Sequence, residues 1–203
     1  FINARKDEGL RPKDIQILHD PLLQTYQQIY QIYQETCDRA GLVDFAELLL
    51  RAHELWLYKP HILAHYQDRF RHILVDEFQD TNSIQYAWLQ MLAGKQARVM
   101  IVGDDDQSIY GWRGAKVENI SRFLRDFAGA ETVRLEQNYR STSTILKAAN
   151  TLIANNVERM GKELWTEGEA GELISVYGAF NEVDEARFVV DRIKQWHSLD
   201  NDL

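Results

Sequence analysis

Apolar positions in the first third of the chain recur at helical spacing. The members of this stripe are Leu22, Leu23, Tyr26, Ile29, Tyr30 and Tyr33;. A second helix is predicted to begin at the cap residue Asp44, with Glu47 at its third position, and to end at or just before Pro60;. We therefore expect residues 1–66 to form an all-helical subdomain.

From about residue 70 the pattern changes to short apolar runs that each end in polar residues. These runs are 72–75, 98–102 and 132–135. Helices are predicted between them at about 82–93, 116–126 and 142–155, and a further strand and helix at 174–177 and about 182–196;. The alternation predicts an α/β fold, a partial parallel sheet with flanking helices. In such sheets ligands bind beyond the carboxyl ends of the strands.

Composition narrows the class of protein. The 203 residues carry a net charge of −8, so any binding of nucleic acid must depend on a few well-placed groups rather than on bulk positive charge;. The single cysteine, Cys37, excludes an internal disulfide and fits a reducing compartment;. No apolar run approaches the roughly 18 residues of a membrane span, and the sequence shows no signal-peptide pattern. Because the chain starts at Phe1, we expect a piece of a longer protein.

The first predicted strand leads directly into Asp76 and Glu77. The first carboxylate of such a pair can hold magnesium, usually through water, and the second can accept a proton from an attacking water. The alternative is an acidic strand end that only caps the next helix.

The second strand leads into a loop, 103–115, that is rich in acids, glycines and aromatic residues. Exposed aromatic rings beside a cation are suited to stacking on unpaired bases, so Tyr110, Trp112 and Arg113 are candidate contacts to single-stranded nucleic acid. Gln107 can both donate and accept a hydrogen bond, which suits a sensor of a terminal phosphate. The alternative is that the two rings fill a core beneath the loop.

The third run is followed by Tyr139, Arg140 and Ser141. An arginine just before a helix could stabilise the charge that develops as a triphosphate is cleaved, and the tyrosine ring could stack on adenine. Ser141 is expected to cap the helix. The alternative for Arg140 is an ordinary surface residue.

Three segments, 74–81, 102–115 and 135–141, resemble motifs II, III and IV of superfamily 1 DNA helicases of the UvrD/Rep/PcrA type;. The resemblance extends over nearly the whole chain. It implies a RecA-like motor, with 1–66 as the helical part of a 1B-like subdomain, 67–135 as the C-terminal part of domain 1A and 136–203 as the start of domain 2A. It further implies that Asp76 coordinates magnesium, that Glu77 activates water and that Gln107 contacts the γ-phosphate and relays its state to DNA. Tyr110, Trp112 and Arg113 would contact single-stranded DNA. Tyr139 would stack on adenine, and Arg140 would act as an arginine finger.

The same resemblance implies an ATP- and Mg²⁺-dependent helicase that moves along single-stranded DNA and unwinds duplexes in repair or replication. Implied partners are single-stranded DNA, single-strand/duplex junctions and repair proteins, with no membrane, at the bacterial nucleoid in the cytoplasm. We expect Asp76, Glu77, Gln107 and Arg140 to line one rim around the nucleotide.

The chain departs from the family pattern in one respect. Neither Gly94-Lys95 nor Gly161-Lys162 completes a G-x-x-x-x-G-K-[ST] phosphate loop, and motifs V and VI would lie beyond Leu203;. We therefore expect the isolated chain to bind ATP weakly and to be inactive as an ATPase. The resemblance also implies that the first strands of the sheet precede residue 1, so we expect an uncovered sheet edge and, with it, partial instability or self-association.

Two other classes of protein are open alternatives. A metal-dependent nuclease could use Asp76, Glu77 and the acids at 104–106, although consecutive acids are not expected to face one ion. A non-catalytic module could bind a partner protein or duplex DNA through the helical first part.

Overall fold

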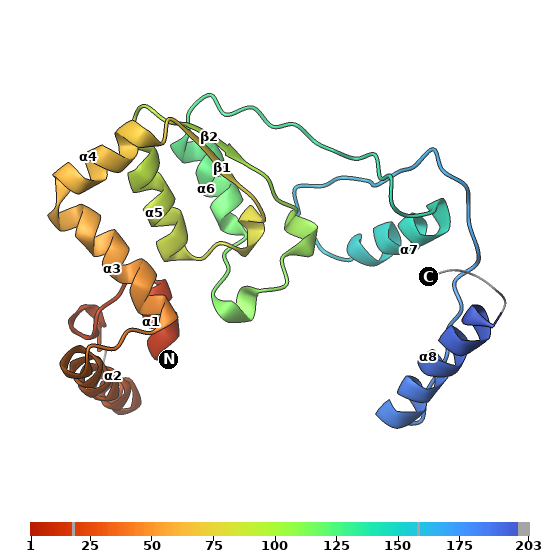
Figure 1. Cartoon of the computed structure of the whole chain (residues 1–203), viewed down its shortest axis with the longest axis horizontal. Coiled ribbons are helices and arrows are strands. Elements are labelled where there is room, and N and C mark those ends of the chain that lie inside the picture. The colour runs from red at the N-terminus through yellow and green to blue at the C-terminus, as the bar shows by residue number, and fades with distance from the viewer. Residues whose placement is uncertain (18, 158, 199–203) are drawn as a thin grey trace. The chain divides into compact units, whose positions relative to one another are not determined.

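The computed structural model describes residues 1–17, 19–157 and 159–198. The chain divides into two compact units, Phe1–Val133 and Arg134–Leu203, and each is described by itself. Figure 1 shows the order of the elements along the chain.

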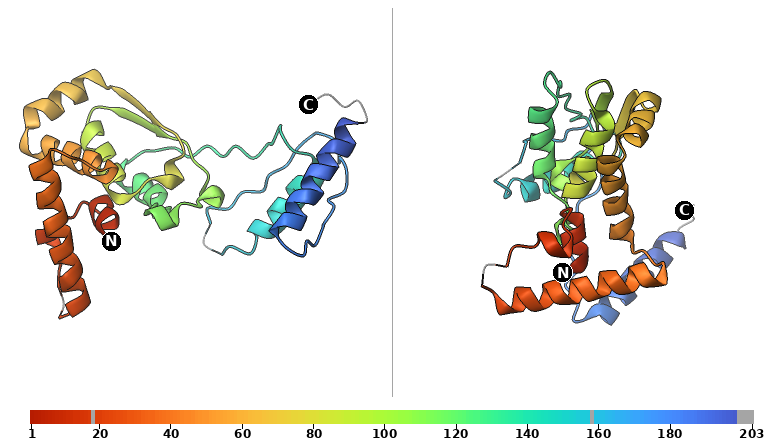
Figure 2. Two further views of the ribbon diagram at one scale, coloured as in Figure 1. Left: turned by 60° about the horizontal axis from the view of Figure 1, so that its bottom comes forward. Right: turned by 90° about the vertical axis from the view of Figure 1, so that its left-hand side faces the viewer.

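The first unit begins with helices only. They are α1 (Ile2–Asp7), the 3-10 turn η1 (Pro12–Asp14), α2 (Pro21–Ala40), α3 (Phe45–Tyr58) and α4 (Pro60–Arg69). The predicted cap of α3 is confirmed, because Asp44 Oδ1 accepts the Glu47 N–H at 2.7 Å;. Helix α2 is the long helix in Figure 2, and it ends at Gly41 in the left-handed conformation;. The last helix, α4, runs across position 66 and ends just before β1.

A buried cluster of charges joins these helices. The carboxylate of Glu47 is 1% exposed and receives Lys6 Nζ at 2.8 Å, Arg11 Nη1 at 2.9 Å and Arg51 Nε, while Lys6 also reaches Asp44 at 2.7 Å. Burial alone would raise the pKa of Glu47, but the hydrogen bonds from Arg51, Lys6 and Arg11 outweigh it and hold that pKa below its ordinary value;. Charge pairing therefore fixes α1 and η1 against α3.

The sheet consists of two parallel strands, β1 (His72–Val75) and β2 (Arg98–Ile101), joined through α5 (Ser83–Ala93). Helix α6 (Glu118–Asp126) follows β2. The core cluster that packs against alternate strand residues is Phe78, Tyr86, Leu89 and Phe123. Leu74 and Met100 on the other face are 73% and 57% exposed, so helices cover one face of this sheet;. The predicted α/β class with a parallel sheet is confirmed.

Two of the predicted strands are absent from the described residues. Segments 132–135 and 174–177 have no regular secondary structure, and Val133 and Leu135 are largely exposed. A strand needs a neighbour that accepts and donates its backbone hydrogen bonds, and across the described ranges neither segment has one;. The isolated bridge between Gln137 and Trp165 lies outside both segments. Both segments have the apolar residues typical of a strand, but a strand forms only where a neighbouring strand pairs with it.

The second unit contains α7 (Ser143–Ile153) and α8 (Glu182–His197), each within about two residues of its predicted bounds;. The expected cap at Ser141 is wrong: the N-cap of α7 is Thr142, and the Ser141 N–H instead donates to Asn138 Oδ1 at 2.8 Å. Among the described residues, no helix combines the length and apolar character needed to cross a membrane.

Candidate functional site

The segments that follow the two strands lie against each other. The Val102 N–H donates to the Val75 carbonyl at 2.7 Å, and the Phe78 N–H donates back to the Val102 carbonyl at 3.0 Å. The parallel register thus continues past the strand ends and brings residues 76–80 beside residues 103–108;. In the first unit, these two polar segments therefore lie side by side at the carboxyl ends of the strands, as expected for a parallel sheet.

The two acids after β1 are exposed and held in a defined turn. The Glu77 N–H donates to Asp76 Oδ1 at 2.9 Å, and Glu77 itself has a φ of +49° in the left-handed region. That region costs a non-glycine residue on the order of 1–3 kcal/mol, so it persists only where neighbouring bonds enforce it. One such bond is donated by Gln79 Nε2 to Glu77 Oε2 at 2.7 Å. The carboxylate of Glu77 therefore has a fixed partner at the strand end.

The loop after β2 begins with the 3-10 turn η3 (Asp105–Gln107), capped by Asp104, whose Oδ1 accepts the Asp106 N–H at 3.1 Å. The exposed Gln107 donates from Nε2 to Asp104 Oδ2 at 2.6 Å. One oxygen from each of the three aspartates lies within 4.8 Å of the others. The expectation that consecutive acids would not face one point is wrong, because the tight turn gathers them on one side.

The next turn, η4 (Gly111–Arg113), presents the aromatic residues. Trp112 is 76% exposed, Tyr110 is half-buried, and the Arg113 guanidinium lies 4.6 Å and 4.9 Å from the centres of their rings. The alternative that the indole fills a core is wrong. The three side chains form an exposed patch of two rings and one cation, the combination that stacks on unpaired bases.

Tyr139 and Arg140 belong to the second unit and are exposed. Asn138 Oδ1 accepts the Arg140 N–H at 2.9 Å, and the Tyr139 hydroxyl donates to Gln137 Oε1 at 2.8 Å. The first bond orders the backbone at Arg140, and the Tyr139 ring and the Arg140 side chain remain exposed. The approach of Arg140 to the strand ends of the first unit stays a prediction.

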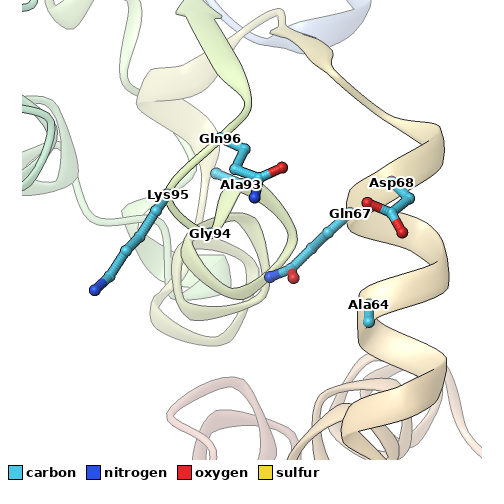
Figure 3. A pocket seen from close by; sticks show the side chains of 7 residues that line it. All are labelled: Ala64, Gln67, Asp68, Ala93, Gly94, Lys95 and Gln96. Atoms are coloured by element: carbon cyan, nitrogen blue, oxygen red, sulfur yellow. The ribbon is translucent and has the colours of Figure 1, made fainter.

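Sequence reasoning missed Gln79, which is 1% exposed and bonded to both strand-end segments. Its position beside Phe78, directly after the acidic pair, was the available signal, but hydrophobic periodicity does not identify a buried amide. A shallow pocket lies elsewhere, at the amino-terminal ends of the strands (Figure 3). Its lining residues are Ala64, Gln67, Asp68, Ala93, Gly94, Lys95 and Gln96. None of the predicted site residues lines this pocket.

Comparison with known proteins gives matches along nearly the whole chain. The model of the UvrD/REP helicase N-terminal domain matches residues 1–128, and that of the UvrD-like helicase C-terminal domain matches residues 133–203. DNA helicase II of Escherichia coli (strain K12) is 74% identical over 196 residues, which are 97% of this chain and 27% of that protein. DNA helicase II of Haemophilus influenzae is 66% identical over 97% of the chain and 27% of its own length. The ATP-dependent DNA helicase PcrA of Staphylococcus aureus is 45% identical over 95% of the chain and 26% of its own length. The chain spans about a quarter of the length of these relatives.

Proposed function

The chain belongs to the UvrD/REP helicase family, and from this we propose that it is part of an ATP-dependent motor that moves along single-stranded DNA and unwinds duplex DNA. The observation that carries the proposal is one continuous segment, 103–113. It starts against Phe78 and Gln79, which directly follow the acidic pair at the end of β1, and it carries the exposed indole of Trp112 near its far end. A nucleotide site and a DNA contact thus share one loop.

The donor set at the strand end fits a magnesium nucleotide. Asp76 offers a carboxylate at the surface, the hard oxygen ligand that Mg²⁺ prefers, and a single such ligand holds the hydrated ion through water;. When bound, the ion would neutralise charge on the terminal phosphates. Glu77 would accept the proton of the attacking water, and Gln107 would contact the γ-phosphate.

The second unit supplies the remaining proposed contacts to nucleotide. The accessible ring of Tyr139 would stack on adenine. The Arg140 guanidinium would stabilise the charge on the phosphate as its terminal bond breaks, which is the role of an arginine finger. Binding of ATP would then draw the second motor domain toward the first, and hydrolysis would release it.

The aromatic patch would grip DNA. Tyr110, Trp112 and Arg113 would contact single-stranded DNA by stacking and by pairing with phosphate, without preference for sequence. Alternating grip, driven by the nucleotide cycle, would move the motor along one strand toward a single-strand/duplex junction. We propose that it works with repair or replication proteins at the nucleoid, in the cytoplasm.

The proposed domain plan follows the family. Residues 1–66 would form the helical part of a 1B-like subdomain, 67–135 the C-terminal part of domain 1A, and 136–203 the start of domain 2A. The division of contacts between Val133 and Arg134 supports the second boundary.

The test uses a full-length chimera in which this chain replaces the 196 matching residues of E. coli DNA helicase II. We expect ATPase activity that requires Mg²⁺ and is stimulated by single-stranded DNA. Glu77→Gln is expected to lower kcat about 10²–10⁴-fold, the usual contribution of a general base. A chimera that folds but hydrolyses ATP at the same rate with and without this substitution would contradict the assigned role of Glu77.

The isolated chain is proposed to be inactive, because its sequence contains no phosphate loop;. The exposure of Leu74 and Met100 on one sheet face supports self-association of the isolated chain;. Sedimentation of the purified chain should therefore show concentration-dependent oligomers, and a strict monomer would contradict this.

A metal-dependent nuclease is a second candidate function, because the carboxylates of Asp104, Asp105 and Asp106 lie close together;. A nicking assay with Mg²⁺ or Mn²⁺ distinguishes it from the motor, because the motor leaves the DNA backbone intact. DNA titrations of the isolated chain at low and high salt would test a non-catalytic binding module.

A further inference from the structure

Gln79 is a buried amide that joins the segments after both strands. Its side chain is 1% exposed. Nε2 donates to Glu77 Oε2 at 2.7 Å, and Oε1 accepts the N–H of Asp104 at 3.0 Å. Its backbone carbonyl accepts the Ser108 hydroxyl at 3.4 Å. One residue therefore contacts the proposed general base and the start and end of the turn that carries Gln107.

The direction of this amide is determined by its neighbours. A backbone N–H can only donate, so the group facing Asp104 must be the amide oxygen. The amide nitrogen then faces Glu77, whose carboxylate can only accept when ionised. Reversal would place the amide nitrogen against the Asp104 N–H and the amide oxygen against the Glu77 carboxylate, which is costly for a side chain that is 1% exposed;. The Gln79 amide thus has one orientation in which both its oxygen and its nitrogen are hydrogen-bonded. We call this pair of hydrogen bonds between Glu77 and Asp104 the bridge.

Close packing also restricts where the amide can go. A Cβ at Gly103 would lie 2.7 Å from Gln79 Oε1, 3.2 Å from the Phe78 nitrogen and 3.3 Å from the Gln79 nitrogen. Only glycine lets the two segments approach this closely. A shift of the loop at 103–104 must therefore move the amide, and with it the partner of Glu77.

We propose that Gln79 is a positioning residue that holds the carboxylate of Glu77 for catalysis and ties its position to the loop between β2 and the DNA-contacting aromatics. This inference rests on the proposed function, in which Glu77 activates water. It adds a residue without direct contact to substrate, which acts through Glu77 and Asp104.

The informative substitution is Gln79→Glu. The new carboxylate still accepts the Asp104 N–H, but it cannot donate to Glu77. The hydrogen bond to Glu77 is therefore replaced by repulsion between two carboxylates, while the bond to Asp104 is kept. In the full-length chimera we expect kcat for ATP to fall about 10- to 100-fold, the scale of a misplacement of about 1 Å. The KM for ATP should change by no more than about twofold, because Gln79 makes no direct contact with the nucleotide in the proposed arrangement.

Gln90→Glu is the matched control. Gln90 Nε2 also donates to a carboxylate, Asp126 Oδ2, at 2.7 Å, but it lies on α5 away from the strand ends. The same change of amide to acid should there leave kcat and stimulation by DNA at the wild-type level.

A second variant addresses the loop side of the bridge. Gly103→Ala presses on the same amide oxygen without adding charge, and it is expected to reduce the stimulation of ATPase by single-stranded DNA. If Gln79→Glu does not fold, this variant decides the matter alone: wild-type stimulation in Gly103→Ala overturns the proposal.

Glu77→Gln separates the inference from the proposed function. If Glu77→Gln abolishes ATPase while Gln79→Glu keeps wild-type kcat and DNA stimulation, the positioning role is overturned and the motor stands. If Glu77→Gln keeps full activity, the assignment of the base fails and the positioning role falls with it. A loss of kcat in Gln79→Glu, with unchanged KM and a normal Gln90→Glu, supports the proposal.

Discussion

Replacement of Trp112 by alanine tests the proposed grip on DNA. The indole is 76% exposed, so its removal takes little apolar surface out of the folded core and should leave the unfolding temperature nearly unchanged;. It is the most accessible ring of the patch, since Tyr110 is half-buried, and we therefore count the loss of one stacked base. One base–aromatic stack is worth about 1–3 kcal/mol, which corresponds to an affinity for single-stranded DNA weaker by about 5- to 150-fold.

The assay is fluorescence anisotropy of a labelled oligothymidine with the full-length chimera at one fixed salt concentration, because salt alone changes such affinities strongly. Trp112→Phe keeps a flat ring and should retain most of the affinity. Phe45→Ala removes an aromatic ring that is 91% exposed on α3, outside the patch, and should bind as the wild type does. Wild-type affinity in Trp112→Ala would refute the stacking role, and a large drop in its unfolding temperature would show that the indole supports packing instead.

Three further substitutions test the packing that supports the site, each by urea unfolding of the purified chain. Glu47→Gln should lower the free energy of unfolding by about 3 kcal/mol at pH 7, since it breaks a buried charge cluster. The folded-state pKa of Glu47 is lowered, so the ionised carboxylate contributes fully to the free energy of unfolding above its unfolded-state pKa;. This contribution is lost as pH falls through the folded-state pKa. A difference in stability between Glu47→Gln and wild type that stayed constant into strong acid would contradict this. Gly103→Ala should cost about 1–3 kcal/mol through overlap of its methyl group with Gln79, and an unchanged unfolding midpoint would argue against the close approach;. Tyr86→Phe should cost about 1.5 kcal/mol by removing the 2.7 Å hydrogen bond to Asp126, and equal stability would mean that water replaces it;.

Local features of the fold were predictable from sequence. A helix depends on residues three and four positions apart, and a cap on its first turn, so the pattern around Asp44 located α3 correctly;. The strands 72–75 and 98–101 were also found, because apolar runs between helices are typical of parallel sheets;. The same signal failed at 132–135, since composition does not reveal whether a neighbouring strand is available for pairing.

The parts that could not be predicted depend on contacts distant in sequence. Lys6 and Glu47 are ordinary surface residue types, yet they lie 2.8 Å apart in a buried cluster because α1 folds back on α3;. Gln79 is close to the acidic pair in sequence, but its bond to Asp104 spans 25 positions. The spacing of the motifs therefore predicted the exposed candidate residues of the site and missed the buried amide that is hydrogen-bonded to both strand-end segments.

The two ends of segment 103–113 differ physically, and this difference explains how one loop could serve two ligands. At Gly103 the chain is pressed against Gln79 with no room for a methyl group, whereas at Trp112 the side chain is open to solvent. Between them lie two short 3-10 turns, η3 and η4, in which few backbone bonds resist displacement;. If the proposed roles hold, a base that stacks on the exposed end shifts a segment whose closed end touches the partner of the catalytic carboxylate. The coupling must be reciprocal, so nucleotide would change the affinity for DNA by the factor by which DNA changes the affinity for nucleotide.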